Sequence, residues 1–342
     1  MKRLAILLTL APLCLWGDVR YTITQLVPND SAIGNSSAGR LNEVGDVVGG
    51  FFNGTALHGF LYTDQLGFSD LGSGPLGILN VNGINSAGQI SAYGPVSAGG
   101  THAFRYTPGI GFVDLGTAAG QAAETTDINN SGQVIGTYTA NDGTDHAFRY
   151  SDGVGMEYLG LSSAQFSAAR GINGLGWVTG TSDNRAFLYR DDVGAVDIGA
   201  GSGWGINNTG VVVGEDSSLH PVMYLNGQMI PLGGIGRATG INNFNLVVGT
   251  VDADSFMHGF VWSQEEGMLD LNSLIDPNSG WFIASAGRVN DAGQIVGWGF
   301  SLERGNIPTP FRLDPIPEPS TWTLLILGTG AFCFLRRRRN PR

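Results

Sequence analysis

One short pattern recurs along almost the whole sequence, and this repetition constrains the fold more than any other feature. In each copy an apolar residue precedes an asparagine, and successive asparagines lie 43, 44, 44, 34, 35 and 48 residues apart. The repeated asparagines are Asn42, Asn85, Asn129, Asn173, Asn207, Asn242 and Asn290. A repeat of this length is typical of proteins in which every copy forms one supersecondary unit and packs against its neighbours.

Two further positions recur within these units. The first is usually His-x-Phe and reads His58/Phe60, His102/Phe104, His146/Phe148, Arg185/Phe187, His220/Val222, His258/Phe260 and Thr309/Phe311. The second is usually Asp-Leu-Gly, and its central residues are Leu71, Leu115, Leu159, Ile198, Leu232 and Leu271. We expect the phenylalanines to pack between units. The histidines are expected to bond to a neighbouring unit, and the asparagines to the backbone of the turn that follows each of them.

The third unit indicates the secondary structure most clearly. Its four apolar stretches, about 124–129, 133–139, 146–151 and 156–160, are separated by turn sequences such as Asn130-Ser131-Gly132. With 54 glycines in 342 residues and only 14% charged residues, the composition suits many short strands and tight turns. Four antiparallel strands that return at these intervals are the signature of β-propeller blades.

The seventh unit is incomplete, because no Asp-Leu-Gly sequence follows Phe311. An alternating stretch at residues 21–26 precedes the first unit and has no other partner. Pairing this stretch with the last unit would close the ring and leave no exposed strand edge. The sequence therefore predicts an all-β fold, a seven-bladed β-propeller over residues 18–314 that is closed by an N-terminal strand completing the last blade.

The N-terminus has the features of a secretory signal peptide. Lys2 and Arg3 precede an apolar run of 12 residues, Leu4 to Leu15, and polar sequence follows Gly17. This order predicts a signal peptide over residues 1–17 with cleavage after Gly17. An uncleaved anchor and a lipoprotein processed at Cys14 are the alternatives.

The C-terminus, residues 315–342, has three parts in a fixed order. Pro317, Glu318 and Pro319 precede an apolar run over 322–335, which is followed by Arg336, Arg337, Arg338 and Arg339. The tail resembles the PEP-CTERM sorting signal of bacterial envelope proteins, which implies recognition and cleavage by an exosortase in the inner membrane. Four arginines are expected to stay on the cytoplasmic side and leave the main body outside. The apolar run of 14 residues would span only ~21 Å of a ~30 Å hydrocarbon core, so its insertion in the inner membrane is expected to be transient. A plain tail anchor is the alternative.

Removing both ends changes the charge and the redox chemistry of the chain. Cys14 and Cys333 leave with the ends, so no disulfide is expected in the mature protein. Residues 18–317 carry 28 acidic and 11 basic side chains, a formal charge of −17, and no lysine. A nucleic-acid partner needs a basic surface, so this class of partner is excluded.

The repeats also resemble the HAF family of extracellular bacterial repeats, named for His-Ala-Phe as found at residues 102–104 and 146–148. The resemblance covers most of the repeat region and implies a secreted or surface repeat protein with no defined activity. Arg185, Val222 and Thr309 depart from the pattern, which argues against chemistry at the histidine position.

Motifs for catalysis and metal binding are absent from the sequence. It contains no Gly-x-Ser-x-Gly, no His-Glu-x-x-His and no P-loop, so we name no catalytic residue and no metal ligand. The repeated histidines are expected to lie too far apart to share a metal ion. Two acidic loops, 141–145 and 252–254, offer oxygen ligands without EF-hand spacing, so calcium is the one cofactor left open.

Three tryptophans are the candidate ligand-binding residues. Trp177 and Trp204 occupy positions that hold smaller residues in other units, and Trp281 lies in a long insertion. Flat aromatic side chains of this kind can stack on sugar rings, although they can also fill space between uneven units.

We therefore expect a non-enzymatic, exosortase-processed structural or interaction protein of a Gram-negative envelope or extracellular matrix, associated with extracellular polysaccharide. Its other partners would be the secretion machinery and the exosortase. The alternative is a secreted carbohydrate-active lyase or hydrolase that uses the propeller funnel, and a convergent cluster of carboxylates, His and Arg would favour it.

Overall fold

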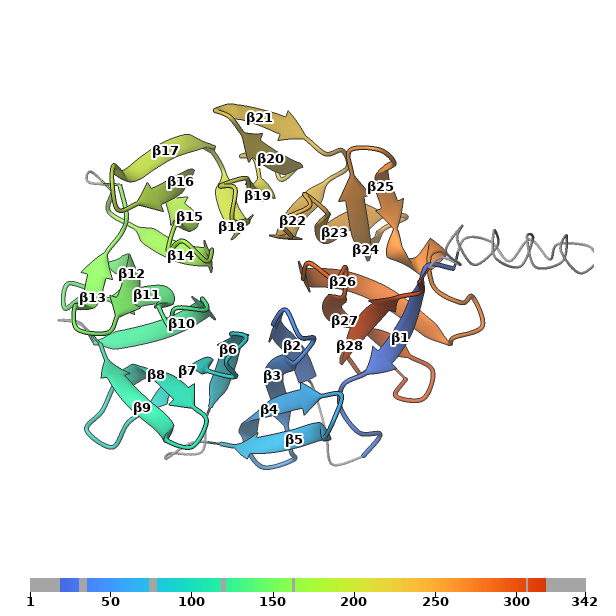
Figure 1. The fold of residues 1–342 in the computed structure, drawn as a ribbon, viewed down its shortest axis with the longest axis horizontal. Coiled ribbons are helices and arrows are strands. Elements are labelled where there is room, and N and C mark those ends of the chain that lie inside the picture. The colour runs from blue at the N-terminus through green and yellow to red at the C-terminus, as the bar shows by residue number, and fades with distance from the viewer. Residues whose placement is uncertain are drawn as a thin grey trace, which may run out of the picture.

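The computed structural model describes residues 19–30, 36–73, 79–117, 121–161, 164–305 and 307–317. In these ranges the chain forms 28 strands and one short 3-10 helix, Leu271–Ser273. All but one of the strand pairings are antiparallel, and the strands are arranged around a centre (Figure 1). The predicted all-β, propeller-type architecture is therefore confirmed.

Strands of four kinds succeed one another from the centre outwards (Figure 1). The innermost are β2 (Ser36–Leu41), β6 (Asn80–Ile84), β10 (Ala122–Ile128), β14 (Ser167–Ile172), β18 (Ser202–Ile206), β22 (Gly236–Ile241) and β26 (Trp281–Val289). Next lie β3 (Val47–Phe52), β7 (Ile90–Pro95), β11 (Val134–Thr139), β15 (Val178–Ser182), β19 (Val212–Glu215), β23 (Val247–Ala253) and β27 (Ile295–Ser301).

The two outer kinds of strand carry the His-x-Phe and the Asp-Leu-Gly positions. The third strands are β4 (Leu57–Thr63), β8 (Thr101–Thr107), β12 (Asp145–Ser151), β16 (Arg185–Arg190), β20 (Pro221–Leu225), β24 (Phe256–Ser263) and β28 (Thr309–Pro315). The outermost are β5 (Gly67–Gly72), β9 (Gly111–Gly116), β13 (Gly155–Tyr158), β17 (Gly194–Ala200), β21 (Gln228–Pro231), β25 (Gly267–Asp270) and β1 (Tyr21–Gln25).

The strands form five four-stranded sheets and one eight-stranded sheet. The larger sheet consists of β6–β9 and β10–β13, which are joined by a single parallel bridge between Thr101 and Ala122. The strands expected in the third unit agree with β10–β13 to within about two residues. Every innermost strand contains an irregularity in its pairing with the second strand, just before the repeated asparagine.

The hydrophobic core lies between neighbouring sheets. The phenylalanines of the third strands are buried as expected, and five of them are fully buried: Phe60, Phe148, Phe187, Phe260 and Phe311. A glycine on the second strand makes room for each ring. A methyl group on Gly136 would overlap the carbonyl oxygen of Glu124 and lie 2.8 Å from Cε1 of Phe148. Glycine is therefore needed here for close approach.

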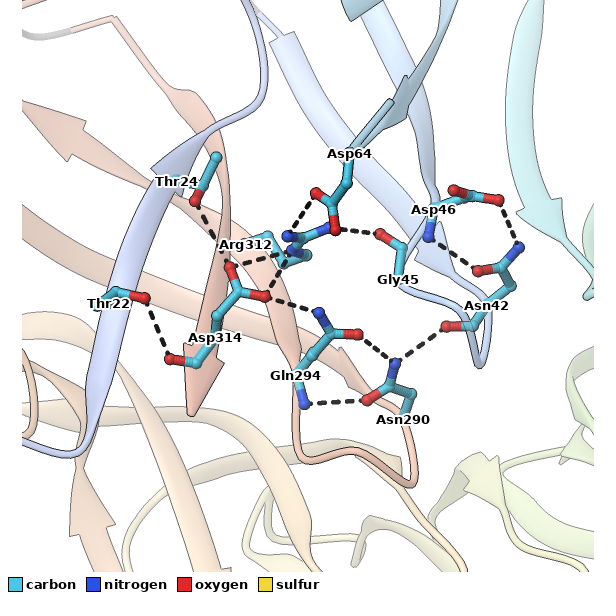
Figure 2. A network of polar contacts seen from close by, with 10 residues as sticks. All are labelled: Thr22, Thr24, Asn42, Gly45, Asp46, Asp64, Asn290, Gln294, Arg312 and Asp314. Atoms are coloured by element: carbon cyan, nitrogen blue, oxygen red, sulfur yellow. Dashed lines mark hydrogen bonds and ion pairs between the residues drawn. The ribbon is translucent and has the colours of Figure 1, made fainter. Parts of the chain in front are cut away.

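The first and last parts of the described chain lie side by side. β1 pairs antiparallel with β28, from Tyr21 opposite Pro315 to Gln25 opposite Phe311. Figure 2 shows how polar side chains extend this contact. Asp314 accepts hydrogen bonds from Thr24 and Gln294, while the neighbouring Arg312 reaches the first unit. The Arg312 guanidinium donates to the carbonyl of Gly45 at 2.8 Å and pairs with Asp64 at 2.8 Å.

The expected signal peptide, residues 1–17, lies outside the described residues, as does the sorting tail beyond Pro317. No helix in the described ranges is long and apolar enough to span a membrane. The C-terminal apolar run, on which we expect such a helix, is not in those ranges.

Candidate functional site

The repeated asparagines form a continuous series of hydrogen bonds around the centre. Asn129 is representative: its Oδ1 accepts from the backbone N–H groups of Ser131 and Gln133, both at 3.0 Å. Its Nδ2 donates to the backbone carbonyl of Asn173 in the next unit at 3.1 Å. The turn bond was predicted from the sequence and is confirmed, whereas the bond between units was not foreseen.

The same donation occurs from every repeated asparagine to the next. The distances are 3.1 Å from Asn42 to Asn85, 2.9 Å from Asn85 to Asn129, 2.9 Å from Asn173 to Asn207, 3.2 Å from Asn207 to Asn242, 3.0 Å from Asn242 to Asn290 and 3.1 Å from Asn290 to Asn42. We call this series the asparagine ring. Its side chains use their donors and acceptors within the protein, which leaves them little capacity for a ligand.

The residues that follow the asparagines form a second, more exposed layer of bonds. Asp291 accepts from the backbone and side-chain nitrogens of Asn243, at 2.8 and 2.7 Å, and its own N–H donates to Glu43 at 2.9 Å. Burial and, more weakly, the charge of Asp291 raise the pKa of Glu43, while the bond from Asp291 acts against this rise. Glu43 and Asp291 thus form an acidic group beside the asparagine ring.

The asparagine ring lines a central cavity of about 250 Å³. Five charged residues also line it: Glu43 and Asp291 of the exposed layer, and Arg40, Asp127 and Arg288. Arg40 and Asp127 form an ion pair across it, with 3.2 Å between Nη1 and Oδ2, and both side chains are almost completely buried. Burial raises the pKa of the Asp127 carboxyl, an effect that Arg40 partly offsets. Burial also lowers the pKa of Arg40.

Arg288 also lines this cavity, and backbone carbonyls hold its guanidinium group. Its guanidinium donates to the carbonyls of Thr239 and Gly287, and to that of Trp204 at 3.1 Å. Arg40 is held in a similar way by the carbonyl of Arg170 at 2.6 Å. The two guanidinium groups therefore fill part of the central space and connect strands of several units.

The repeat pattern did not single out Arg40, Asp127 and Arg288, although the sequence contains a signal for them. Each stands two residues before a repeated asparagine, a position that is glycine in the other four units: Gly83, Gly171, Gly205 and Gly240. A charged residue at a position that otherwise lacks a side chain marks a departure from the repeat, and such departures deserve the same weight as the repeated residues themselves.

The histidines lie on the outer strands, away from the charged residues of the cavity. His58 pairs with Asp70 at 2.8 Å, His102 with Asp114 at 2.9 Å and His258 with Asp270 at 2.7 Å. The expectation that the histidines bond to a neighbouring unit was wrong, because these three partners lie on the adjacent strand of the same sheet. Strand pairing explains this, since the third and fourth strands bring the His and Asp positions side by side. His220 and His146 also bond within their own units, to Asp216 at 3.2 Å and to Thr144 at 2.8 Å.

The structure places the three candidate tryptophans apart from one another. Trp177 lies against Gly210 of the next unit, with the guanidinium carbon of Arg190 5.1 Å from its ring centre. Trp281 begins β26 and makes an edge-on contact with Phe311, with 6.0 Å between ring centres. These two side chains are partly buried, as fillers of space between units would be.

Trp204 has a different environment. It lies on β18, and the guanidinium carbon of Arg170 is 3.9 Å from the centre of its indole, while that of Arg237 is 5.1 Å away. The ring thus already stacks with charged side chains. Ligand binding by the three tryptophans stays a prediction.

Of the two loops considered for calcium, 141–145 uses one of its carboxylates in bonds within the loop. Asp142 accepts from the hydroxyl of Thr144 at 2.6 Å and from its N–H at 3.0 Å, and these bonds lower the pKa of the carboxyl. Within the described part of the chain, no three His, Cys, Asp or Glu residues come together as a metal site would require.

Comparison with known proteins gives the sorting signal first. A family model of the PEP-CTERM protein-sorting motif matches residues 315–339. The chain is therefore a bacterial secreted protein that an exosortase processes for the cell surface or the extracellular space. None of the curated proteins matches the sequence.

Solved structures are similar in fold only. Virginiamycin B lyase from Staphylococcus aureus matches with a TM-score of 0.56 and 10% identity, over 86% of this chain and 100% of that one. An oligogalacturonate lyase in complex with manganese matches with 0.54 and 10%, over 88% and 94%. A puromycin hydrolase matches with 0.53 and 13%, over 81% and 52%. At these identities the likeness concerns the architecture and not the activity.

Proposed function

We propose that this protein is a non-enzymatic interaction module of a Gram-negative cell envelope or extracellular matrix, built as a seven-bladed β-propeller of HAF-type repeats. The observation that carries the proposal is the sorting motif, which follows directly on the last strand of the fold. The N–H of Ile316 donates to the carbonyl of Arg20 at 2.8 Å, so the tail leaves from a point fixed just before β1. A protein sorted in this way acts at the cell surface, where it is attached, or in the extracellular space, where it is released.

Closure of the propeller by its N-terminal strand is part of this proposal. The pairing of β1 with β28, the contacts of Arg312 with the first unit and the bond from Asn290 to Asn42 all support it. A ring with no open sheet edge suits an extracellular protein, because exposed edges promote aggregation.

A binding role is favoured over the lyase or hydrolase alternative by how the charged residues of the cavity are used. Arg40 and Asp127 bond to each other, and Arg288 bonds to backbone carbonyls. Glu43 and Asp291 accept hydrogen bonds from the N–H of Asp291 and from Asn243, respectively. The histidines lie on the outer strands, where they cannot act as acid or base together with these groups. An active site of the expected kind would need them to converge.

Extracellular polysaccharide is the proposed partner of the sorted protein. During sorting, the C-terminal helix is inserted transiently in the inner membrane. The test replaces Arg336–Arg339 by Gln in the full chain expressed in its own host. We expect the processed wild type, ending near residues 317–320 by intact mass, to be retained with surface polysaccharide, and the variant to be retained uncut in the membrane fraction. Release of the wild type without bound saccharide would contradict the binding role, and turnover of an added saccharide would establish the alternative.

A further inference from the structure

Three neighbouring residues on the innermost strands form a cluster that the repeat does not require. Arg170 on β14, Trp204 on β18 and Arg237 on β22 come from three consecutive units (Figure 1). The two guanidinium groups lie 3.9 and 5.1 Å from the centre of the Trp204 ring. Arg170 and Trp204 directly precede Gly171 and Gly205, which line the cavity, and none of the three residues of the cluster is itself part of the cavity lining.

Comparison with the other units shows what has been replaced. The residues equivalent to Arg170 and Trp204 are Asn82, Thr126 and Thr239 in three other units. Each donates from its side chain to a backbone carbonyl of the next unit: Asn82 at 2.6 Å, Thr126 at 2.8 Å and Thr239 at 2.7 Å. In two adjacent units, a stacked guanidinium and indole thus replace the side-chain hydrogen bond that connects the three other units to the next one.

The cluster concentrates positive charge in an acidic protein. Arg170 and Arg237 form no salt bridge with the described residues, and Nε of Arg170 is buried without a hydrogen-bond partner there. Arg40 and Arg288 both donate to the backbone carbonyl of Arg170, so four of the eleven arginines of residues 18–317 lie around this point.

The carboxylates nearby do not balance this charge. Asp127 is engaged by Arg40. Glu215, at the end of β19, is 7% exposed; burial raises the pKa of its carboxyl, while the charges of Arg237 and Arg170 act in the opposite direction. Glu215 forms no salt bridge with either guanidinium group, so two positive charges face one carboxylate at longer range and keep the capacity to bind a further anion.

We propose that Arg170 and Arg237, held by Trp204, bind an oxyanion, either the carboxylate of an acidic saccharide or a free inorganic anion. Planar guanidinium groups bind carboxylate and sulfate oxygens through paired N–H bonds, and stacking on an indole fixes their orientation at little entropic cost. The formal charge of −17 opposes the approach of an anion over a distance, but screening over about 8 Å at physiological salt leaves the contact itself dominant.

The test is calorimetric titration of the processed protein recovered from its host, with sodium glucuronate, sodium sulfate and glucose as probes. We expect binding of one glucuronate or one sulfate and none of glucose. Arg170→Gln and Arg237→Gln should each weaken it about tenfold or more, whereas Glu215→Gln should strengthen it. A purely structural cluster would not respond in opposite directions to the two kinds of change.

Arg190→Gln is the matched control, because Arg190 also stacks on a tryptophan, Trp177, but has Asp192 as its ion-pair partner. Affinity should be unchanged in this variant, and thermal unfolding checks that all variants are folded. Tighter binding of glucuronate would identify a saccharide carboxylate, and tighter binding of sulfate an inorganic anion.

The proposal is overturned if neither anion binds up to about 20 mM, or if Arg190→Gln weakens binding as much as Arg170→Gln. The anion-binding proposal depends on the proposed function only where it names an acidic saccharide as a source of the anion. Because the probes are small free anions, failure of surface retention would leave this result unaffected.

Discussion

The asparagine ring and the His–Asp pairs are both built from repeated residues, yet the first is uniform and the second is not. All seven asparagines donate to the next unit. Three units have a His–Asp pair between their outer strands, and the fifth has His220 with Asp216 at 3.2 Å in the preceding loop. One unit has Arg185 with Asp197 instead, and His146 contacts Thr144 at 2.8 Å. The difference is that the ring bonds pass between units, whereas the pairs stay within one sheet.

A ring fold depends most on the repeated positions that connect one unit to the next. Backbone hydrogen bonds already hold the strands of one sheet together, so a side-chain pair on its outer strands can change without moving the neighbours. No backbone ladder joins most adjacent sheets, and their relative positions depend on side chains and packing. A small misplacement at one interface would also accumulate around the ring. Uniform asparagines are the expected result.

Removing β1 is the severest test of contacts between the ends of the chain. Deletion of residues 19–25 exposes the edge of β28 and uncovers Leu313 and Ile295, which pack with Tyr21 in one core cluster. We expect aggregation, or a fall in the melting temperature of more than about 10 °C. Thermal unfolding with light scattering measures this. An unchanged melting temperature would reject the proposed closure but not the repeats.

The asparagine ring should show the next largest effect. Asn129→Ala removes two part-buried acceptor bonds to the following turn, the donor bond to the Gln133 side chain and the buried donor bond to Asn173. Lost buried hydrogen bonds cost about 1–3 kcal/mol each when a partner is left unsatisfied, so a loss of about 3 kcal/mol or more is expected in urea unfolding.

Asn130→Ala is the control for the ring, because Asn130 is exposed and accepts a single bond, from the N–H of Ser86 at 2.9 Å. Its cost should be about 1 kcal/mol or less. If the two variants lost the same free energy of unfolding, the buried asparagine ring would stabilise the fold no more than the exposed residues beside it. The special role given to the ring would then be wrong.

Periodicity in the sequence was sufficient for the architecture. Turn signals and alternation located the strands of the third unit, and the asparagine turns were correctly interpreted because Asn Oδ1 bonds locally to the N–H groups two and four residues on. Bonds between units could not be derived in this way. They depend on the distance between residues some 34 to 48 positions apart, which is fixed only when the ring is assembled.

The central cavity was predictable only in part. That Arg40, Asp127 and Arg288 depart from glycine is visible in the sequence, but that Arg40 pairs with Asp127 two units away is a consequence of ring geometry. For Trp204, the sequence indicated an unusual position. It did not indicate that Arg170 and Arg237 stack on the ring, since this requires knowing which strands lie side by side.

A third contact between units is made by arginine. Unlike the asparagine ring, it is present in only some units. Arg149 donates to the carbonyl of Gly176 at 2.9 Å and pairs with Asp191 of the next unit at 2.7 Å. The equivalent residue of the fourth unit is Leu188, so the fold tolerates an apolar side chain here. Arg149→Leu should therefore cost only about 1–2 kcal/mol in urea unfolding. A cost above that of Asn129→Ala would contradict this order.

The smallest effect is expected within a sheet. His102 pairs with Asp114 across β8 and β9, and the Asp114 side chain is 48% exposed. Exposed pairs of this kind contribute about 0–1 kcal/mol, and the backbone ladder between the two strands stays intact. We expect His102→Gln to lower the free energy of unfolding by less than about 1 kcal/mol, and Asp114→Asn to do the same. The double variant should lose no more than the larger single one, since both changes remove one interaction. A loss as large as that of Asn129→Ala would show that contacts within a sheet matter as much as contacts between units, and variation at the histidine position would then need another explanation.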